Sequence, residues 1–493
     1  MWNMRYAFDH GFHYGFWLEL MVCRLGIRQM WVPGYPRDRV LSAKLRRLLF
    51  VNVYVIGASR PQFDQEAAAA ALGSVTEGIQ DLGHSIVSEP LMVSEWEIDR
   101  QLTQEVRDHQ RLADIVVIVV ATFVGADMVV KMLSGVEEKA VLWAVPEPVV
   151  GLGRLQLNSL CGAIITNNAL KSMSREISVV YGDPKDKKTR ADFERHLRVE
   201  RVVNILSSTL LGIVGQRPTG YYPSDFDELQ LLRSFGVRVK RFSLDEAFRY
   251  GADVSNDAVD RGVGEAHQRL QNITQLASEQ VNQSVRAEQG IRNLIQEHGL
   301  TSMCVECWPQ FMTDFGGAIC WANSRLIDDG IMAGCEADVH GTLTMIIQKE
   351  LSGHSPFFGD LVHVSNGDRL VFWHCGAAPL SLAGEAPRAS VHPNRRVGMT
   401  VDFALRPGQV TVVRLHRDGR GQYSLMAIPG EAPNDPLYFS GNSVAVKPHT
   451  DASSVLAKLM EDGAEHHFAV GYDVSLDDVV ALGRRLNIPV NVY

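Results

Sequence analysis

A long alternation of apolar runs with helical segments constrains this fold more than any other feature. The first apolar run, LFVNVYVIG at residues 49–57, ends in glycine and precedes a helical pattern at 64–82. Strands that alternate with helices predict a parallel sheet covered on both faces, so we expect an α/β domain at residues 49–182. Its later members are a helix at 94–112, strands at 114–120 and 140–145, and a helix near Met128.

A polar segment, GDPKDKKTR at residues 182–190, separates this domain from a second round of the same alternation. The second round predicts another α/β domain at residues 183–353, also with a parallel sheet. Its predicted elements are helices at 191–208 and 225–235, strands at 211–214, 237–242 and 302–305, and long polar helices within 257–293.

The texture changes after Gly353 to short alternating runs separated by Gly, Pro, Asn and Asp. This pattern is typical of antiparallel strands, and it predicts a C-terminal, mainly antiparallel β-domain at residues 354–493. The fold class expected is therefore α/β, with two successive Rossmann-like domains followed by a β-domain. The clearest runs lie at 368–374, 409–416 and 423–428, and a helix near 476–486 and a strand at 489–493 close the chain.

Residues 1–48 read unlike the rest of the chain. We interpret them as an atypical N-terminal extension, either an appended or misassigned start or an arm that binds a partner. Aromatic and histidine side chains crowd its beginning at Trp2, Tyr6, Phe8, His10, His13, Tyr14 and Trp17.

Charge and composition exclude several classes of partner. A net charge of -9 argues against nucleic acid, because phosphate binding needs a concentrated basic face. No run approaches the roughly 20 apolar residues of a membrane span. Seven scattered cysteines do not suggest a disulfide framework. We therefore expect a soluble, cytoplasmic protein with a small-molecule ligand.

Carboxylates in the last third of the chain are the first candidates for chemistry. Glu336 and Asp338 stand in the segment CEAD at 335–338, where a helix begins. Helix capping and the helix dipole would select the same residue types there. Asp360 precedes a strand at 361–364, as either a desolvated acid or a turn residue.

Histidines supply the second half of the candidate set. His374 ends an apolar strand, where a lone imidazole is more often a hydrogen-bonded core residue than a ligand. His466 and His467 lead the strand at 468–471, and because alternate residues face opposite sides we expect one to point inward and the other outward. Carboxylates with neutral imidazoles suit Mn²⁺ or Co²⁺ better than a structural thiolate zinc.

Cys304 and Cys307 have the spacing of a redox or zinc-knuckle pair, but no second pair follows at zinc-finger distance. We interpret them as core cysteines. The chain also lacks a complete dinucleotide-binding or phosphate-loop motif.

The order of four segments resembles the L-fucose isomerase and L-arabinose isomerase superfamily. These segments are CEAD at 335–338, FGD at 358–360, WHCG at 373–376 and the histidine pair at 466–467. The pieces LWAVP at 142–146, NSLCG at 158–162 and PTG at 218–220 are similar to features of fucose-isomerase-like members.

The resemblance implies roles for individual residues. Glu336 and Asp360 would be metal ligands and acid–base residues, His467 a further ligand, and His374 a ligand or near neighbour. It also implies a homo-oligomer, a hexamer or trimer, with active sites between subunits. The candidate substrate-binding residues are Trp308, Asp338, Trp373, His466 and Asn158.

The expected function is therefore metal-dependent interconversion of an aldose and a ketose, a pentose or 6-deoxyhexose, through an enediol, with Mn²⁺ as the expected ion. Two alternatives stay open at this point. The same ligands could serve a metal-dependent aldolase or hydrolase of a small polyol. Two successive α/β domains also superficially resemble periplasmic binding proteins, which favours a non-catalytic sugar-binding protein.

Overall fold

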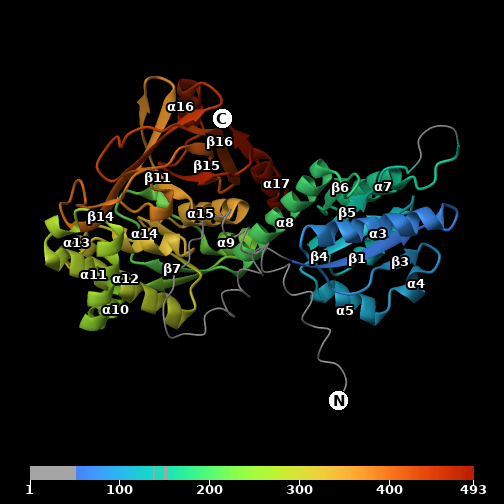
Figure 1. The fold of residues 1–493 in the computed structure, drawn as a ribbon, viewed down its shortest axis with the longest axis horizontal. Coiled ribbons are helices and arrows are strands. Elements are labelled where there is room, and N and C mark those ends of the chain that lie inside the picture. The colour runs from blue at the N-terminus through green and yellow to red at the C-terminus, as the bar shows by residue number, and fades with distance from the viewer. Residues whose placement is uncertain (1–50, 137–138, 149–152) are drawn as a thin grey trace, which may run out of the picture.

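The computed structural model describes residues 51–136, 139–148 and 153–493. The predicted extension at 1–48 lies outside the described residues. Figure 1 shows two α/β units and a β-rich unit, built on two parallel sheets and one mainly antiparallel sheet. The predicted fold class is confirmed.

The first sheet has six parallel strands in the order β2-β1-β4-β5-β6, with β3 also beside β1. Every residue of β4 is buried, as expected for a strand covered on both faces. The strands are β1 (Asn52–Ser59), β2 (Ser85–Ile86), β3 (Leu91–Ser94), β4 (Ile115–Val120), β5 (Ala140–Ala144) and β6 (Ser178–Tyr181). The helices are α3 (Gln65–Asp81), α4 (Ile98–Gln101), α5 (Gln104–Leu112), α6 (Ala126–Leu133) and α7 (Ser159–Ser172).

The helix predicted at 94–112 is wrong in its extent. Ser94 ends β3, and two helices, α4 and α5, follow it. The break lies at Thr103, whose backbone is extended. Its side chain caps α5 by accepting a hydrogen bond from Val106 N.

The second unit begins with α8 (Lys187–Ser208) and has four parallel strands in the order β10-β9-β7-β8. The strands are β7 (Leu210–Val214), β8 (Arg238–Phe242), β9 (Ser302–Val305) and β10 (Ala333–Cys335). The remaining helices are α9 (Glu228–Phe235), α10 (Leu244–Ala252), α11 (Asn256–Arg269), α12 (Ser278–His298), α13 (Gln310–Thr313), α14 (Cys320–Asp328) and α15 (Val339–Ser352). Cys304 and Cys307 are buried, which confirms them as core cysteines.

The third sheet has nine strands in the order β13-β14-β17-β12-β11-β18-β15-β16-β19. Its pairs are antiparallel except β14 with β17 and β16 with β19. The strands are β11 (Phe357–Ser365), β12 (Arg369–His374), β13 (Arg388–Val391), β14 (Gly398–Ala404), β15 (Gly408–Arg417), β16 (Tyr423–Ala432), β17 (Asn442–Pro448), β18 (His467–Tyr472) and β19 (Val490–Val492). Two helices belong to this region, α16 (Ala452–Glu461) and α17 (Leu476–Leu486).

Helix α15 joins the second and third sheets into one core. It is buried along almost its whole length and contacts β9, β10, β15 and β18. Leu343 and Ile347 share a hydrophobic cluster with Val413 and Ala469 of the third sheet. This packing brings the carboxyl edge of the second sheet against β11 and β18. No described helix is long and apolar enough to cross a membrane.

Candidate active site

The turn between β10 and α15 carries Glu336. Glu336 and the next residue, Ala337, have φ angles of 56° and 51°, in the left-handed region that side-chain-bearing residues rarely adopt. The backbone N–H of Ala337 bonds to Val305 O at 3.0 Å and that of Asp338 to Cys335 O at 3.0 Å. Backbone conformations of this kind cluster at functional sites. The turn follows β10, so Glu336 lies at the carboxyl edge where ligands bind in α/β sheets.

Two adjacent strands of the third sheet bring an acid and an imidazole to this edge. Asp360 of β11 and His467 of β18 are direct cross-strand partners. His467 Nε2 lies 3.2 Å from Asp360 Oδ1 and 3.7 Å from Glu336 Oε2. His466 Nε2 lies 3.2 Å from Glu336 Oε2 and 4.0 Å from Asp360 Oδ1. We call Glu336, Asp360, His466 and His467 the carboxylate–histidine cluster.

One expectation about the histidine pair is wrong. The sequence predicted one inward and one outward imidazole, but both approach Glu336 and their ring centroids lie 4.0 Å apart. His466 precedes the first residue of β18, so the alternation of a strand does not govern its direction. Both imidazoles therefore belong to the cluster.

Exposure increases across the cluster from its base to its mouth. The side chain of His467 is 1% exposed, Glu336 14%, Asp360 25% and His466 33%. Burial alone would raise the pKa of Glu336, but the His466 hydrogen bond and the nearby His467 imidazole hold this pKa below its ordinary value. For His466 the effects are reversed. Burial alone would lower its pKa, but the hydrogen bond to Glu336 and the charge of Asp360 raise it. The cluster thus holds an ionised carboxylate in a partly desolvated place.

Asp338 lies behind the cluster and orients His467. Its carboxylate accepts hydrogen bonds from Gly341 N at 2.8 Å, from Arg414 Nη1 at 2.7 Å and from His467 Nδ1 at 3.0 Å. Burial would raise the pKa of Asp338, but the Arg414 charge and the His467 bond lower it strongly. With its hydrogen on Nδ1, His467 presents the Nε2 lone pair to the cluster. The helix-capping role weighed for this segment belongs to Asp338, the N-cap of α15.

Arg414 was missed by sequence reasoning. Its side chain is 0% exposed, and besides Asp338 it lies 3.5 Å from Glu465, which in turn lies 2.9 Å from His416. The available signal was a charged residue inside the apolar run TVVRL of a predicted strand. A fully buried arginine needs a carboxylate partner, and that partner could have been sought among the acids of 335–338.

An aromatic wall stands on one side of the cluster. Trp308 Nε1 donates a hydrogen bond to Glu336 Oε1 at 3.0 Å. The Tyr221 ring lies 5.5 Å from the Trp308 ring and 5.8 Å from the His466 ring. The guanidinium carbon of Arg395 lies 4.5 Å from the Trp308 ring centroid. Trp308 was a predicted site residue, whereas no sequence pattern singled out Tyr221 or Arg395.

Three other predicted residues lie outside this cluster. His374 is buried with its ring 6.0 Å from that of His467 and its Nδ1 3.5 Å from Cys375 Sγ. Trp373 pairs with Asp360 across β11 and β12, and its Nε1 donates to Ser440 O at 2.8 Å. Asn158 is the N-cap of α7, and Figure 1 shows α7 and α15 in different parts of the molecule.

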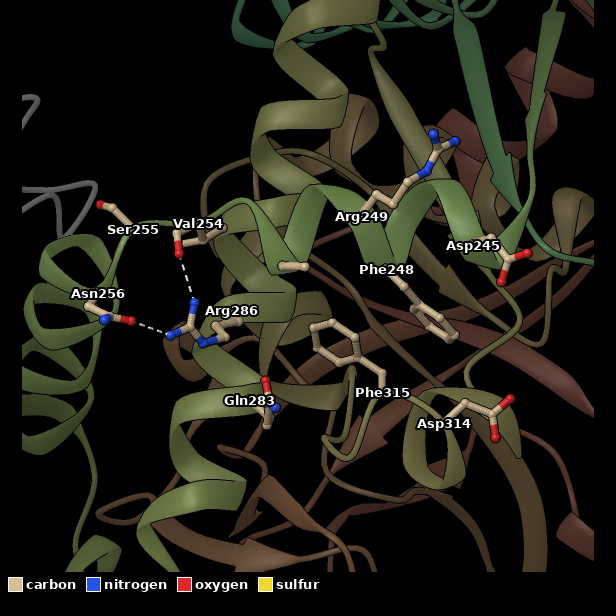
Figure 2. Close-up of a pocket in the computed structure, with 11 residues that line it drawn as sticks. Asp245, Phe248, Arg249, Val254, Ser255, Asn256, Gln283, Arg286, Asp314 and Phe315 are labelled. Carbon is tan, nitrogen blue, oxygen red and sulfur yellow. Dashed lines mark hydrogen bonds between the residues drawn. The ribbon is translucent and has the colours of Figure 1, made fainter.

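A separate hollow of about 850 Å³ lies beside α10 and α12. Figure 2 shows Phe248 and Phe315 facing each other there, and their rings stack at 5.3 Å. Arg286 is engaged with Val254 O at 2.7 Å and with Asn256. None of the residues that line this hollow belongs to the carboxylate–histidine cluster.

The donor atoms of the cluster fit a divalent cation. Glu336, His466 and His467 each offer one ligand atom, all within 4.8 Å of one another. Asp360 Oδ1 is buried without a hydrogen-bond partner, 3.2 Å from His467 Nε2. Mixed carboxylate and imidazole donors suit Mn²⁺ and related ions. His467, oriented by Asp338, has the support that metal-binding histidines usually have.

Several curated relatives match this chain at 32% identity, and no family model matches it. The sulfoquinovose isomerase of Priestia aryabhattai aligns over 448 residues, which is 90% of this chain and 99% of that protein. That of Alkalicoccus urumqiensis aligns over 446 residues, 89% of this chain and 99% of the relative. That of Clostridium sp. (strain MSTE9) aligns over 357 residues, 71% of this chain and 80% of the relative.

The α/β fold, the carboxylate–histidine cluster and these relatives together define an aldose–ketose isomerase that acts on a sugar. Isomerisation is thereby favoured over the aldolase, hydrolase and sugar-binding alternatives. The chain belongs to the sulfoquinovose isomerase family.

Proposed function

We propose that this enzyme interconverts sulfoquinovose, a glucose with a sulfonate in place of its C6 hydroxyl, and the corresponding ketose. We propose Mn²⁺ as its ion. The supporting observation is the cluster of two carboxylates and two imidazoles in a chain that aligns with 99% of a sulfoquinovose isomerase. The order of the segments at 335–338, 358–360, 373–376 and 466–467 further supports membership of the L-fucose and L-arabinose isomerase superfamily.

The reaction moves a proton from C2 of the aldose to C1 through an enediol. Glu336 and Asp360 approach the same two imidazoles from different sheets, so a sugar bound between them has a carboxylate on each side. General acid–base catalysis by a positioned carboxylate contributes roughly 10²- to 10⁴-fold. A divalent ion at the cluster would stabilise the charge that develops on O1 and O2 of the sugar.

The residues around the cluster fix its geometry before substrate binds. Trp308 donates a hydrogen bond to Oε1 of Glu336, and the other oxygen, Oε2, faces His466 and His467. Asp338 holds the ring of His467 from behind. Tyr221 and Trp308 form an aromatic wall beside the acids and limit the access of water to the enediol.

We further propose a homo-oligomer, a trimer or hexamer, in which the first α/β unit of one subunit covers the site of another. Helix α7, whose N-cap is Asn158, carries the exposed apolar side chains Leu160 (40%) and Ile164 (59%). Apolar side chains exposed on one helix are consistent with a subunit contact. The molar mass in solution, measured by light scattering, tests this arrangement, and a monomer at assay concentration contradicts it.

A panel of aldoses tests the substrate and the ion together. Metal-stripped protein is assayed with sulfoquinovose, 6-deoxyglucose, L-fucose and L-arabinose, each with Mn²⁺, Co²⁺ or Mg²⁺. We expect sulfoquinovose with Mn²⁺ to give the highest kcat/KM, and a ketose of unchanged mass to form. In D₂O the ketose should carry deuterium at C1 to the extent that the proton taken from C2 exchanges with solvent before a proton returns to C1. Preference for a neutral sugar, or full activity without metal, contradicts the proposal.

A further inference from the structure

The distal end of the proposed substrate needs a cation that the cluster does not supply. A sulfonate is anionic at every physiological pH, and the chain as a whole carries a net charge of -9. Binding an anion beside two carboxylates is unfavourable unless a positive group compensates. Such a group must lie about one sugar length from Glu336 and Asp360.

Arg395 is the candidate for this positive group. It stands in the turn between β13 and β14, and its guanidinium lies over the Trp308 ring at 4.5 Å. The residue is exposed, and no carboxylate of the described residues lies within 4 Å of its guanidinium nitrogens. Its N–H donors are therefore free to bind an anion in the forked geometry that suits planar or tetrahedral oxyanions.

The turn that carries Arg395 is ordered by its own hydrogen bonds. The backbone N–H groups of Asn394 and Arg395 both donate to His392 Nδ1 at 3.3 Å. The N–H of Arg396 bonds to His392 O at 2.9 Å. A guanidinium on an ordered turn and stacked on an indole loses less conformational entropy when it binds an anion than a freely moving one.

Trp308 spans the distance between Arg395 and the cluster. The indole edge donates to Glu336 Oε1 at 3.0 Å, and its face lies 4.5 Å from the guanidinium carbon of Arg395. The indole thus connects the two groups, through its face to the guanidinium of Arg395 and through its ring N–H to the carboxylate of Glu336. A sugar with C1 and C2 at the cluster can therefore lie along Trp308 with C6 toward Arg395.

Other cations near the site are less suitable. Arg414 is fully buried and paired with Asp338. Arg217 lies 3.7 Å from Asp225 and over the Tyr222 ring. Arg396 is exposed on the same turn as Arg395 but is not stacked on Trp308, which makes it a matched control.

We propose that Arg395 binds the sulfonate group of the substrate and so selects a sulfonated sugar over a neutral one. This inference rests on the proposed function. It assigns a specificity-determining residue at the end of the sugar remote from the reacting carbons.

The test compares Arg395→Gln, Arg395→Lys and the control Arg396→Gln in the intact enzyme. For Arg395→Gln we expect the KM for sulfoquinovose to rise at least about 10-fold, the size of a lost charge-assisted hydrogen bond, with kcat changed less. Arg395→Lys should recover part of the loss, and Arg396→Gln should behave as wild type. The affinity for 6-deoxyglucose, measured as substrate or as competitive inhibitor, should stay unchanged in all three variants.

The outcomes separate this inference from the proposed function. If the wild-type enzyme does not convert sulfoquinovose, both the proposed function and the inference fail. If it does, and Arg395→Gln keeps the wild-type KM, only the inference is overturned. Equal losses for sulfoquinovose and 6-deoxyglucose would also overturn it, because they would show a role that does not depend on the sulfonate.

Discussion

Asp360 and His467 are direct cross-strand partners on β11 and β18, with Oδ1 and Nε2 only 3.2 Å apart. The Phe358 ring packs 4.5 Å from that of His467 and supports the pair from within the sheet. Since a slip of one residue in a sheet moves a side chain to the opposite face, the register of this one strand pair decides whether the cluster forms. The architecture of the β-domain is thus tied directly to the chemistry of the site.

Removing the charge of either acid should abolish turnover. We expect Glu336→Gln and Asp360→Asn each to lower kcat by at least about 10²-fold, the lower limit for a positioned acid–base group. Both replacements preserve shape, and circular dichroism should show an unchanged fold. The measurement is the initial rate of ketose formation. Near-normal rates in both variants contradict the assignment.

Asp338 should control metal affinity without binding the metal. Asp338→Asn keeps a side-chain oxygen for the helix cap but weakens the support of His467, so we expect Mn²⁺ affinity to fall about 10- to 100-fold. Isothermal titration of metal-stripped protein measures this change. The control is Asp451→Asn, at the N-cap of α16, which should bind Mn²⁺ as wild type does. Equal affinity in the two variants would contradict the role of Asp338.

Arg414 should be worth more to stability than any exposed arginine. Arg414→Met leaves Asp338 buried without its charge partner, and breaking a buried pair costs about 3–5 kcal/mol. The exposed turn residue Arg420 is the control, since Arg420→Met should change stability by less than about 0.5 kcal/mol. Denaturant unfolding measures both values. Similar unfolding free energies for the two variants would show that the buried pair is not stabilising.

Acid should destabilise the protein partly through His340. Burial, with the nearby Arg414 charge, lowers the pKa of His340 from 6.5 to about 4. Between these values the unfolded chain binds a proton that the folded protein does not. The stability contribution is therefore present above about pH 6.5 and falls by about 1.4 kcal/mol per pH unit as the pH drops toward 4.

The variant His340→Gln should have a shallower pH dependence of its unfolding free energy between about pH 6 and 5. The control Tyr423→Phe removes the hydroxyl 3.2 Å from His340 Nε2 but leaves the imidazole buried. It should keep the wild-type slope. An unchanged slope in His340→Gln means that this histidine is not the source of the acid sensitivity.

The sequence was most informative where periodicity is strong. The apolar runs of β4 and β15 both predicted their strands, and both strands are buried over most of their length. Helix ends that are set by a capping side chain were harder to predict from the sequence. The residues on both sides of Thr103 have a helical pattern, so the sequence predicted one helix where the structure has two, α4 and α5.

The candidate site was only partly predictable, because local sequence patterns do not show which remote residues come together. Glu336, Asp360 and the histidine pair were proposed from residue type and order, and the structure brings them together. Trp308 and Asp338 were also among the predicted residues, whereas Arg414, Tyr221 and Arg395 were not proposed, because they come from remote elements. Arg414 enters from β15, while Tyr221 and Arg395 come from a loop and a turn whose sequences carry no periodic signal. Contacts of this type depend on tertiary packing, which local patterns do not encode.

Anomalous diffraction from crystals grown with Mn²⁺ tests the central claim most directly. The account predicts one strong manganese peak between Glu336, Asp360 and His467, within bonding distance of their carboxylate oxygens and of His467 Nε2. The peak should weaken or vanish in Asp360→Asn crystals grown in the same way. A protein that isomerises its sugar fully after metal removal, with no manganese peak at this cluster, would contradict the account.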